Sequence, residues 1–383
     1  MAERIALTGA RIFDGESWHD RSALVINDGV VEGIVAADSP VDAERVPAEA
    51  DYLVPGFVDL QVNGGGGALF NETPTLEAIR TICRAFTRFG TTACLPTLIT
   101  DTVPVDEDAI AAGISAAQAA VPGFLGLHLE GPHLSAARKG AHDAALIRPM
   151  QEADLQRLLA ARAKLPNLIV TVAAETVAPE QISRLAAAGI VVSIGHSEST
   201  YAQVRAAVEA GAGMVTHLFN AQSQLGNREP GVVGAALDLG AINAGLIADG
   251  IHVHAATIGV ALRAKRGPGQ AFLVTDAMSP TGTDWTEFEL TGRTVYRKDG
   301  ALRLADGTLA GADLTMIDAV RFMHRQVGVP IEEAFRMASL YPARAIRDAS
   351  RGHLTRGARA DIVALSADLY VRATWIGGEK VWG

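Results

Sequence analysis

Cysteine is nearly absent from this chain of 383 residues, which contains two. Because Cys83 and Cys94 belong to no CxxC pair or Cys/His cluster, the sequence excludes a disulfide framework and a thiolate metal site. Basic residues are also scarce, since 33 Lys and Arg stand against 43 Asp and Glu. The resulting net charge of −10 argues against a nucleic-acid or anionic-membrane partner.

Long apolar runs are missing as well. The longest apolar region, residues 109–129, is broken by Gly113, Pro122 and Gly123, so we do not interpret it as a membrane span. The first residues, "MAERIALTGARIFDG", carry charges and no apolar core. We therefore expect no signal peptide and a cytoplasmic protein.

The pattern of short apolar runs divides the chain into three parts. Residues 1–54 and 354–383 contain short strands with turn signals, including the Asp-Gly of "NDGVVEG". In between, apolar runs alternate with helical stretches such as "PEQISRLAAAG". This alternation predicts an α/β fold: a (β/α)8 TIM-type barrel over residues 55–353, with a small β-sandwich domain formed by both chain ends. A three-layer sandwich is the alternative, but no GxGxxG or P-loop motif supports it.

Polar side chains follow one apolar run after another. In a barrel the carboxyl ends of the strands form one rim, where active sites lie, so we expect these side chains to face one pocket. They are Gln61, Asn63, Glu130, Glu175, His196, His217, Asn220, Asp249, His252, His254 and Asp276.

Glu130 ends the apolar stretch "GLHLEGPHL", where an unpaired carboxylate would be costly. Together with His196 and His217 it makes a two-histidine, one-carboxylate set with an open fourth position, which is typical of a catalytic metal site. We predict one divalent metal, with zinc first and iron, cobalt or manganese also suited. Asp276, directly after "FLVT", is a candidate general base, although "DAMSP" could instead begin a helix that it caps.

The sequence allows two interpretations for each of three further polar residues, His128, Asp59 and Lys139. His128 shares a strand face with Glu130, so it either lies just below the metal or is a hydrogen-bonded core histidine. Asp59 either orients the rim or fills a polar layer. Lys139 is either a contact to a phosphate or a solvated loop lysine.

Seven motifs in order, from "PGFVDLQVNGGGG" through "GLHLEGPHLSAARKGAHD", "SIGHSEST", "THLFNAQSQL", "DGIHVH" and "VTDAMSP" to "LAGADLTMIDAVR", resemble the N-acetylglucosamine-6-phosphate deacetylase family of the amidohydrolase superfamily. The resemblance implies a metal held by Glu130, His196 and His217, with Asp276 as general base and then acid. It implies that His252 polarises the acetamide carbonyl. The other substrate contacts it implies are Ala141, His142, Asn220, Ala221, Arg228, Leu309, Ala310 and Gly311.

The resemblance also implies a homodimer in which Arg228 reaches the neighbouring site to bind the phosphate of an amino sugar. Many superfamily members carry His-x-His on the first strand and hold two metals. Here Gln61 and Asn63 stand in those places, as the remnant of a second site, and an amide is a poor ligand. The expected reaction is deacetylation of N-acetylglucosamine 6-phosphate. The galactosamine isomer, a cyclic-amide hydrolase and a non-catalytic scaffold barrel are the alternatives.

Overall fold

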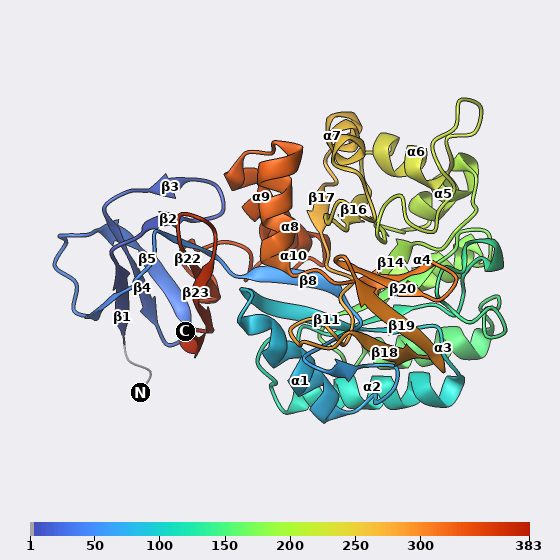
Figure 1. Ribbon diagram of the computed structural model, residues 1–383, viewed down its shortest axis with the longest axis horizontal. Coiled ribbons are helices and arrows are strands. Elements are labelled where there is room, and N and C mark those ends of the chain that lie inside the picture. Colours follow the sequence, from blue (N-terminus) through green and yellow to red (C-terminus); the bar gives the residue numbers. More distant parts are fainter. Residues whose placement is uncertain (1–3) are drawn as a thin grey trace.

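The computed structural model describes residues 4–383 and contains the predicted barrel and small β domain side by side (Figure 1). Eight parallel strands form the barrel sheet in the order β17-β16-β15-β14-β13-β12-β11-β8. A parallel bridge between Val62, at the end of β8, and Ala277, just beyond β17, closes the sheet. The strands are β8 (Phe57–Val62), β11 (Thr91–Ile99), β12 (Leu127–Glu130), β13 (Leu168–Val172), β14 (Val191–Ile194), β15 (Met214–Val215), β16 (Asn243–Leu246) and β17 (Ala271–Leu273).

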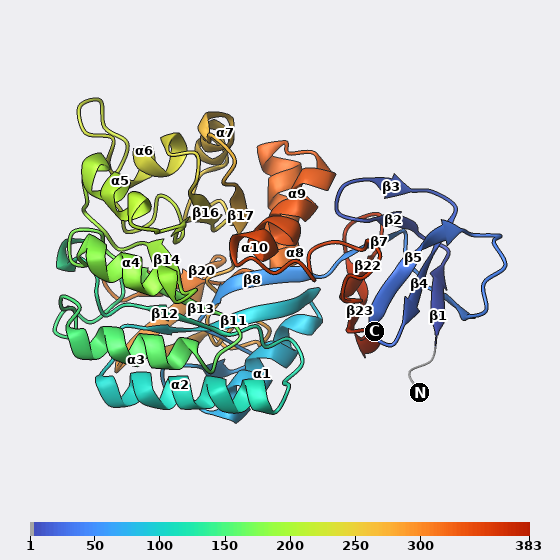
Figure 2. The same cartoon turned by 180° about the vertical axis from the view of Figure 1, so that it is seen from behind.

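One helix follows each barrel strand, which confirms the predicted (β/α)8 fold. Figure 2 shows α2, α3 and α4 lying along the outer face of the sheet. Threonines begin several of these helices: the side chains of Thr75, Thr200 and Thr315 accept hydrogen bonds from the first-turn backbone. The eight helices are α1 (Leu76–Thr87), α2 (Val103–Gln118), α3 (Glu152–Arg162), α4 (Pro179–Ala187), α5 (Tyr201–Glu209), α6 (Gly231–Asp238), α7 (Ala255–Ala264) and α8 (Met316–Phe322).

Shorter elements complete the barrel. The hairpin of β9 (Gly64–Gly65) and β10 (Ala68–Leu69) follows β8, and the 3-10 turn η1 (Ala136–Arg138) follows β12. After α8 the chain continues through the π-helical turn η2 (Met323–Val327) into α9 (Ile331–Ala338) and α10 (Leu340–Ala345).

The small domain joins the two chain ends in two mixed sheets, as predicted. One sheet has the order β5-β4-β1-β6, and the other, β24-β23-β22-β7-β2-β3, pairs N-terminal with C-terminal strands. Asp28 and Gly29 both adopt positive φ between β4 and β5, so the predicted Asp-Gly hairpin is confirmed. The strands are β1 (Ile5–Thr8), β2 (Arg11–Phe13), β3 (Trp18–His19), β4 (Ser22–Asn27), β5 (Val30–Ala36), β6 (Glu44–Pro47), β7 (Tyr52–Pro55), β22 (Ile362–Leu365), β23 (Val371–Ile376) and β24 (Glu379–Trp382).

A four-stranded antiparallel sheet between β17 and α8 was not predicted. It contains β18 (Glu287–Leu290), β19 (Arg293–Lys298), β20 (Ala301–Leu304) and β21 (Leu309–Ala312). Its small core includes Leu290, Val295 and Leu302. The Asp-Gly pair at residues 299 and 300 is a hairpin signal that could have identified this insert.

A large apolar core fills the space between the barrel strands and their helices, with Phe57, Phe86 and Phe272 among its most buried side chains. A separate cluster that includes Leu24, Leu53 and Ile362 lies in the small domain. Among residues 4–383, no helix combines the length and the apolar character needed to cross a bilayer.

Candidate active site

A cavity of about 340 Å³ opens at the carboxyl ends of the barrel strands. A residue that lines this cavity stands at or shortly after the end of four strands: Glu130 for β12, His196 for β14, His217 for β15 and Asp276 for β17. The predicted site residues that line this cavity are Asn63, Glu130, Ala141, His142, His196, His217, Asn220, Ala221, His252, Asp276, Leu309 and Gly311. The larger hollow on the small domain, of about 1080 Å³, is lined by none of the predicted site residues.

Glu130, His196 and His217 come together at the floor of the cavity. Glu130 Oε1 lies 3.1 Å from His196 Nε2 and 2.9 Å from His217 Nε2, and the two imidazole nitrogens are 3.1 Å apart. All three residues are 5% exposed or less. Burial alone would raise the pKa of Glu130, but its interactions with the two neighbouring imidazoles hold it well below its usual range.

This donor set fits a single divalent cation. His196 Nδ1 lies 2.8 Å from the backbone oxygen of Arg138, which can only accept, so Nδ1 carries the proton and Nε2 keeps its lone pair for a metal. His217 Nδ1 is buried and has no hydrogen-bond partner among residues 4–383. Two imidazole nitrogens and one carboxylate oxygen are ligands that zinc-like ions take at about 2.0–2.2 Å.

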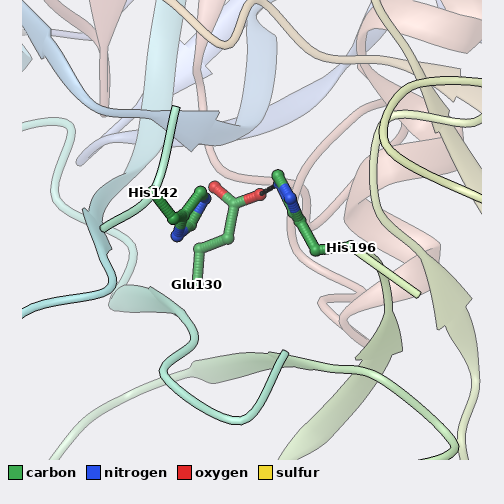
Figure 3. Close-up of side chains that lie close together, drawn as sticks. All are labelled: Glu130, His142 and His196. Atoms are coloured by element: carbon green, nitrogen blue, oxygen red, sulfur yellow. Dashed lines mark hydrogen bonds and ion pairs between the residues drawn. The ribbon is translucent and has the colours of Figure 1, made fainter. Parts of the chain in front are cut away.

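His142 also lies close to this group (Figure 3). Glu130, His142 and His196 each offer one ligand atom within 4.8 Å of the others. However, the backbone N–H of Thr100 donates to His142 Nδ1 at 3.3 Å, and burial lowers the pKa of His142 well below its usual value. The neutral imidazole therefore carries its proton on Nε2, which suits a hydrogen bond to a substrate oxygen better than a metal contact.

Asp276 is held by two side-chain amides. Its Oδ1 accepts from Asn63 Nδ2 at 2.6 Å and from Gln61 Nε2 at 3.0 Å, and the same Gln61 nitrogen lies 3.1 Å from Glu130 Oε2. Burial, and then the negative charge of Glu130, raise the pKa of Asp276 to about 6. The two amides thus occupy the place of the absent histidines and fix the candidate base, which caps no helix here.

The backbone is strained where the chain turns into the cavity. His196, His217 and Asp276 adopt positive φ values of 45°, 30° and 52°. Such left-handed conformations of non-glycine residues cost on the order of 1–3 kcal/mol each and cluster at functional sites. The turns place all three side chains over the mouth of the barrel.

His252 completes the polar lining. Its Nδ1 lies 2.6 Å from Asp249 Oδ2, so its Nε2 is turned toward the cavity. Burial opposes the ionisation of Asp249, yet the hydrogen bond with His252 lowers the pKa of that carboxyl. Asp249 therefore orients the histidine.

Four expected residues lie elsewhere. Ala310 is fully buried in the core of the inserted sheet, between the cavity-lining Leu309 and Gly311. Arg228 is exposed on the loop after β15 and does not line the cavity of its own chain. Glu175 accepts instead from the hydroxyls of Ser197 and Ser199, at 2.7 and 2.5 Å. His254 accepts from the backbone N–H of Ala256 at the start of α7.

The three residues with two interpretations are also placed by the structure. His128 and Asp59 lie inside the barrel beneath the cavity, fully hydrogen-bonded, and burial lowers the pKa of His128 to about 4 and raises that of Asp59 to about 7. Lys139 is exposed, and its Nζ lies 3.4 Å from the oxygen of Gly140.

Sequence reasoning missed several residues of the lining. Arg138 contributes a cation from η1 and forms an ion pair with Glu198. Ile99, Met278 and Leu290 contribute apolar surface. Met278 lies in the motif "VTDAMSP", so its proximity to Asp276 could have identified it. Leu290 could not be identified without the inserted sheet, to which it belongs.

The comparisons with known proteins agree with this geometry. Residues 52–381 match the Amidohydrolase family. The N-acetylgalactosamine-6-phosphate deacetylase of Shewanella sp. (strain ANA-3) is 42% identical over 377 residues, which are 98% of this chain and 95% of the relative. The human N-acetylglucosamine-6-phosphate deacetylase is 37% identical over 352 residues, 88% of this chain and 85% of the relative.

Solved structures extend the similarity to nearly every residue. N-acetylglucosamine-6-phosphate deacetylase from Pasteurella multocida superposes with a TM-score of 0.95 at 34% identity, over 99% of this chain and 100% of the other. A mutant of the Mycobacterium smegmatis enzyme, solved in complex with N-acetyl-D-glucosamine-6-phosphate, gives a TM-score of 0.92 at 32% identity and full coverage of both chains. The resemblance predicted from the motifs is thus confirmed, and the chain belongs to the amidohydrolase family.

Proposed function

We propose that this protein hydrolyses the acetamide of N-acetylglucosamine 6-phosphate to glucosamine 6-phosphate and acetate. The observation that carries the proposal is the buried set of Glu130, His196 and His217 with Asp276 beside it in one cavity. Full-length similarity to N-acetylglucosamine-6-phosphate deacetylases supports the substrate class. A non-catalytic scaffold would have no reason to keep these four residues together.

The three ligands hold one divalent metal, with zinc first and iron(II), cobalt or manganese also suited to the donor set. When bound, such a cation brings the pKa of a water molecule toward neutrality and polarises the amide carbonyl. Asp276 Oδ2, the carboxylate oxygen that Asn63 and Gln61 leave free, takes the proton of the attacking water. It then gives that proton to the leaving amine nitrogen, and acetate departs.

The remaining cavity residues bind and orient the sugar. The outward Nε2 of His252 contacts the acetamide carbonyl, with its ring fixed by Asp249. His142, Ala141, Asn220, Ala221 and the strand Leu309–Ala312 surround the sugar ring. Gln61 and Asn63 present their amide nitrogens, which are not metal ligands, to the carboxylates of Glu130 and Asp276, so they do not supply a second metal site beside these carboxylates.

The phosphate needs a cation, and an arginine offers a planar fork of donors that matches its oxygens. Arg228 lies outside the cavity of its own chain, so its contact with the phosphate requires a homodimer in which it reaches the site of the neighbouring subunit. This arrangement makes the active site incomplete in a single chain.

A second candidate substrate is the galactosamine isomer. The observation that favours it is the relative from Shewanella, which is 42% identical and is a deacetylase of N-acetylgalactosamine 6-phosphate. The two sugars differ at one hydroxyl, and a few cavity groups can distinguish them.

Acetate release from both sugar phosphates and from free N-acetylglucosamine tests the proposal. We expect the glucosamine phosphate to give the highest kcat/KM, with the unphosphorylated sugar poorer by a factor on the order of 10² or more. A higher kcat/KM for the galactosamine phosphate would transfer the assignment to that isomer. No acetate from any of the three would contradict the proposed function.

A further inference from the structure

Four buried polar side chains form a continuous row of hydrogen bonds inside the barrel, below the cavity. His128 Nδ1 lies 3.1 Å from the backbone oxygen of Leu60, and His128 Nε2 lies 2.7 Å from Thr171 Oγ1. Thr171 Oγ1 lies 2.7 Å from Thr216 Oγ1, which lies 2.6 Å from Ser193 Oγ. We call His128, Thr171, Thr216 and Ser193 the hydroxyl row; each is 4% exposed or less.

The chemistry of these groups allows one direction of donation. The Leu60 carbonyl can only accept, so His128 Nδ1 donates to it. No carboxylate contacts this imidazole, and an uncompensated buried cation is costly, so the ring is neutral and Nε2 accepts from Thr171. The Thr171 oxygen then accepts from Thr216, and the Thr216 oxygen accepts from Ser193. Only this direction of donation gives every contact in the hydroxyl row one donor and one acceptor.

The row lies one layer below the candidate metal ligands. His128 precedes Glu130 by two residues on the same face of β12, and Thr216 directly precedes His217. Ser193 lies on β14, the strand that leads into His196. The row therefore connects the three strands that carry the ligands, and Thr171 of β13 lies in its middle.

Gly195, directly before His196, connects the row to the ligand layer. A Cβ atom at Gly195 would lie 2.8 Å from Thr171 Cγ2 and 2.9 Å from Thr216 Cβ. The backbone of Gly195, where the strained turn at His196 begins, thus packs closely against Thr171 and Thr216. A shift of either threonine side chain would move this turn.

We propose that the hydroxyl row positions Glu130, His196 and His217 for metal binding, with Thr171 as its central positioning residue. This inference rests on the metal site of the proposed function, although not on its substrate. Barrel interiors are filled mainly by branched apolar side chains, which pack well but fix no orientation. Directed hydrogen bonds from strand to strand hold the side chains, and the ligand-bearing turns above them, in one arrangement.

Thr171→Val tests the proposal, because valine keeps the shape and removes the central hydroxyl. It leaves His128 Nε2 without a donor and the Thr216 hydroxyl without its acceptor. We expect zinc affinity, measured by competition with a chelator well below the unfolding temperature, to fall about 10- to 100-fold. Thr171→Ser, which keeps the hydroxyl, should bind zinc nearly as tightly as the unchanged protein.

Thr91→Val is the matched control. Thr91 lies on β11 of the same barrel, is 2% exposed, and its hydroxyl has no partner among residues 4–383, so its removal should leave zinc affinity unchanged. Equal zinc affinity in Thr171→Val and the unchanged protein would overturn the proposal. An equal loss of zinc affinity in Thr171→Val and Thr171→Ser would also overturn the proposal, since the hydroxyl would then be irrelevant.

Ser193→Ala provides a second variant should Thr171→Val fail to fold. It removes only the terminal donor and leaves the other bonds of the row intact, so we expect a smaller loss of zinc affinity, about three- to tenfold. Unchanged affinity in this variant would likewise overturn the proposal. Zinc affinity is measured without substrate. Failure of the unchanged protein to release acetate would therefore contradict the proposed function, while the effect of the hydroxyl row on zinc affinity would still be measurable.

Discussion

Replacing Asp276 with asparagine removes the candidate base and almost nothing else. Asn63 and Gln61 donate to one oxygen of this carboxylate, at 2.6 and 3.0 Å. The carbonyl oxygen of the new amide can accept both bonds, which places its NH2 group where Oδ2 stood. An amide nitrogen cannot take a proton from water at neutral pH, so the geometry is kept while the proton transfer is lost.

The expected loss follows from the role of a positioned general base. Such a group contributes about 10²- to 10⁴-fold to the rate. At about 1.36 kcal/mol for each factor of ten, this corresponds to about 3–5 kcal/mol of transition-state stabilisation. We expect Asp276→Asn to lower kcat for acetate release by this factor, with KM little changed and one metal per chain still bound.

Asp106→Asn is the control, because it makes the same chemical change at a buried carboxylate of α2, outside the lining of the cavity. It should leave kcat unchanged. A metal-loaded Asp276→Asn protein with kcat within threefold of the unchanged protein would refute the assignment of Asp276 as base. Loss of the metal in this variant would instead mean that Asp276 belongs to the metal site.

Three other substitutions have distinct expected outcomes. His196→Ala should lose both bound metal and activity, and metal analysis that finds full occupancy would exclude His196 as a ligand. Arg228→Ala should raise KM for the phosphorylated sugar by a factor on the order of 10 to 100 while KM for free N-acetylglucosamine stays constant; equal changes would exclude a phosphate contact. Burial raises the pKa of Asp106 to about 7, although Arg157 at 3.9 Å opposes this shift. Ionisation of Asp106 is therefore harder in the folded state than in the unfolded state, and the folded state loses stability as pH rises from about 4 to 7. Asp106→Asn should therefore stabilise the protein by about 1–2 kcal/mol in denaturant unfolding at pH 8 and by much less at pH 4.5, and a gain independent of pH would contradict the shift.

The repeated order of apolar run, polar residue and helix was enough to predict the barrel and its rim. Glu130 ends its strand, and His196, His217 and Asp276 come soon after theirs, so their meeting at one end of the barrel is a consequence of parallel strands. Glu175 also comes soon after its strand, β13, yet it binds Ser197 and Ser199, and His254 lies farther on, where it binds the first turn of α7. Which rim residues turn inward depends on loop conformation, and sequence position does not determine that.

The parts that could not be predicted depend on contacts between distant segments. Positive φ, as at His196, His217 and Asp276, is uncommon for residues other than glycine, although Asp and His adopt it more often than most, and its occurrence depends on the packing of the turns. The tautomer of His142 depends on Thr100, which is 42 residues away in sequence. The hydroxyl row likewise requires the registry of β12 through β15, so the hydrogen-bond partners of His128 could be identified only from the structure.

Titration of the metal-free protein with zinc tests the central claim most directly. Acetate release from N-acetylglucosamine 6-phosphate should be negligible at the start and rise linearly to a plateau at about one zinc per chain. Activity that keeps rising to about two equivalents would contradict the single site formed by Glu130, His196 and His217. Full activity in the metal-free protein would contradict the metal-dependent reaction itself.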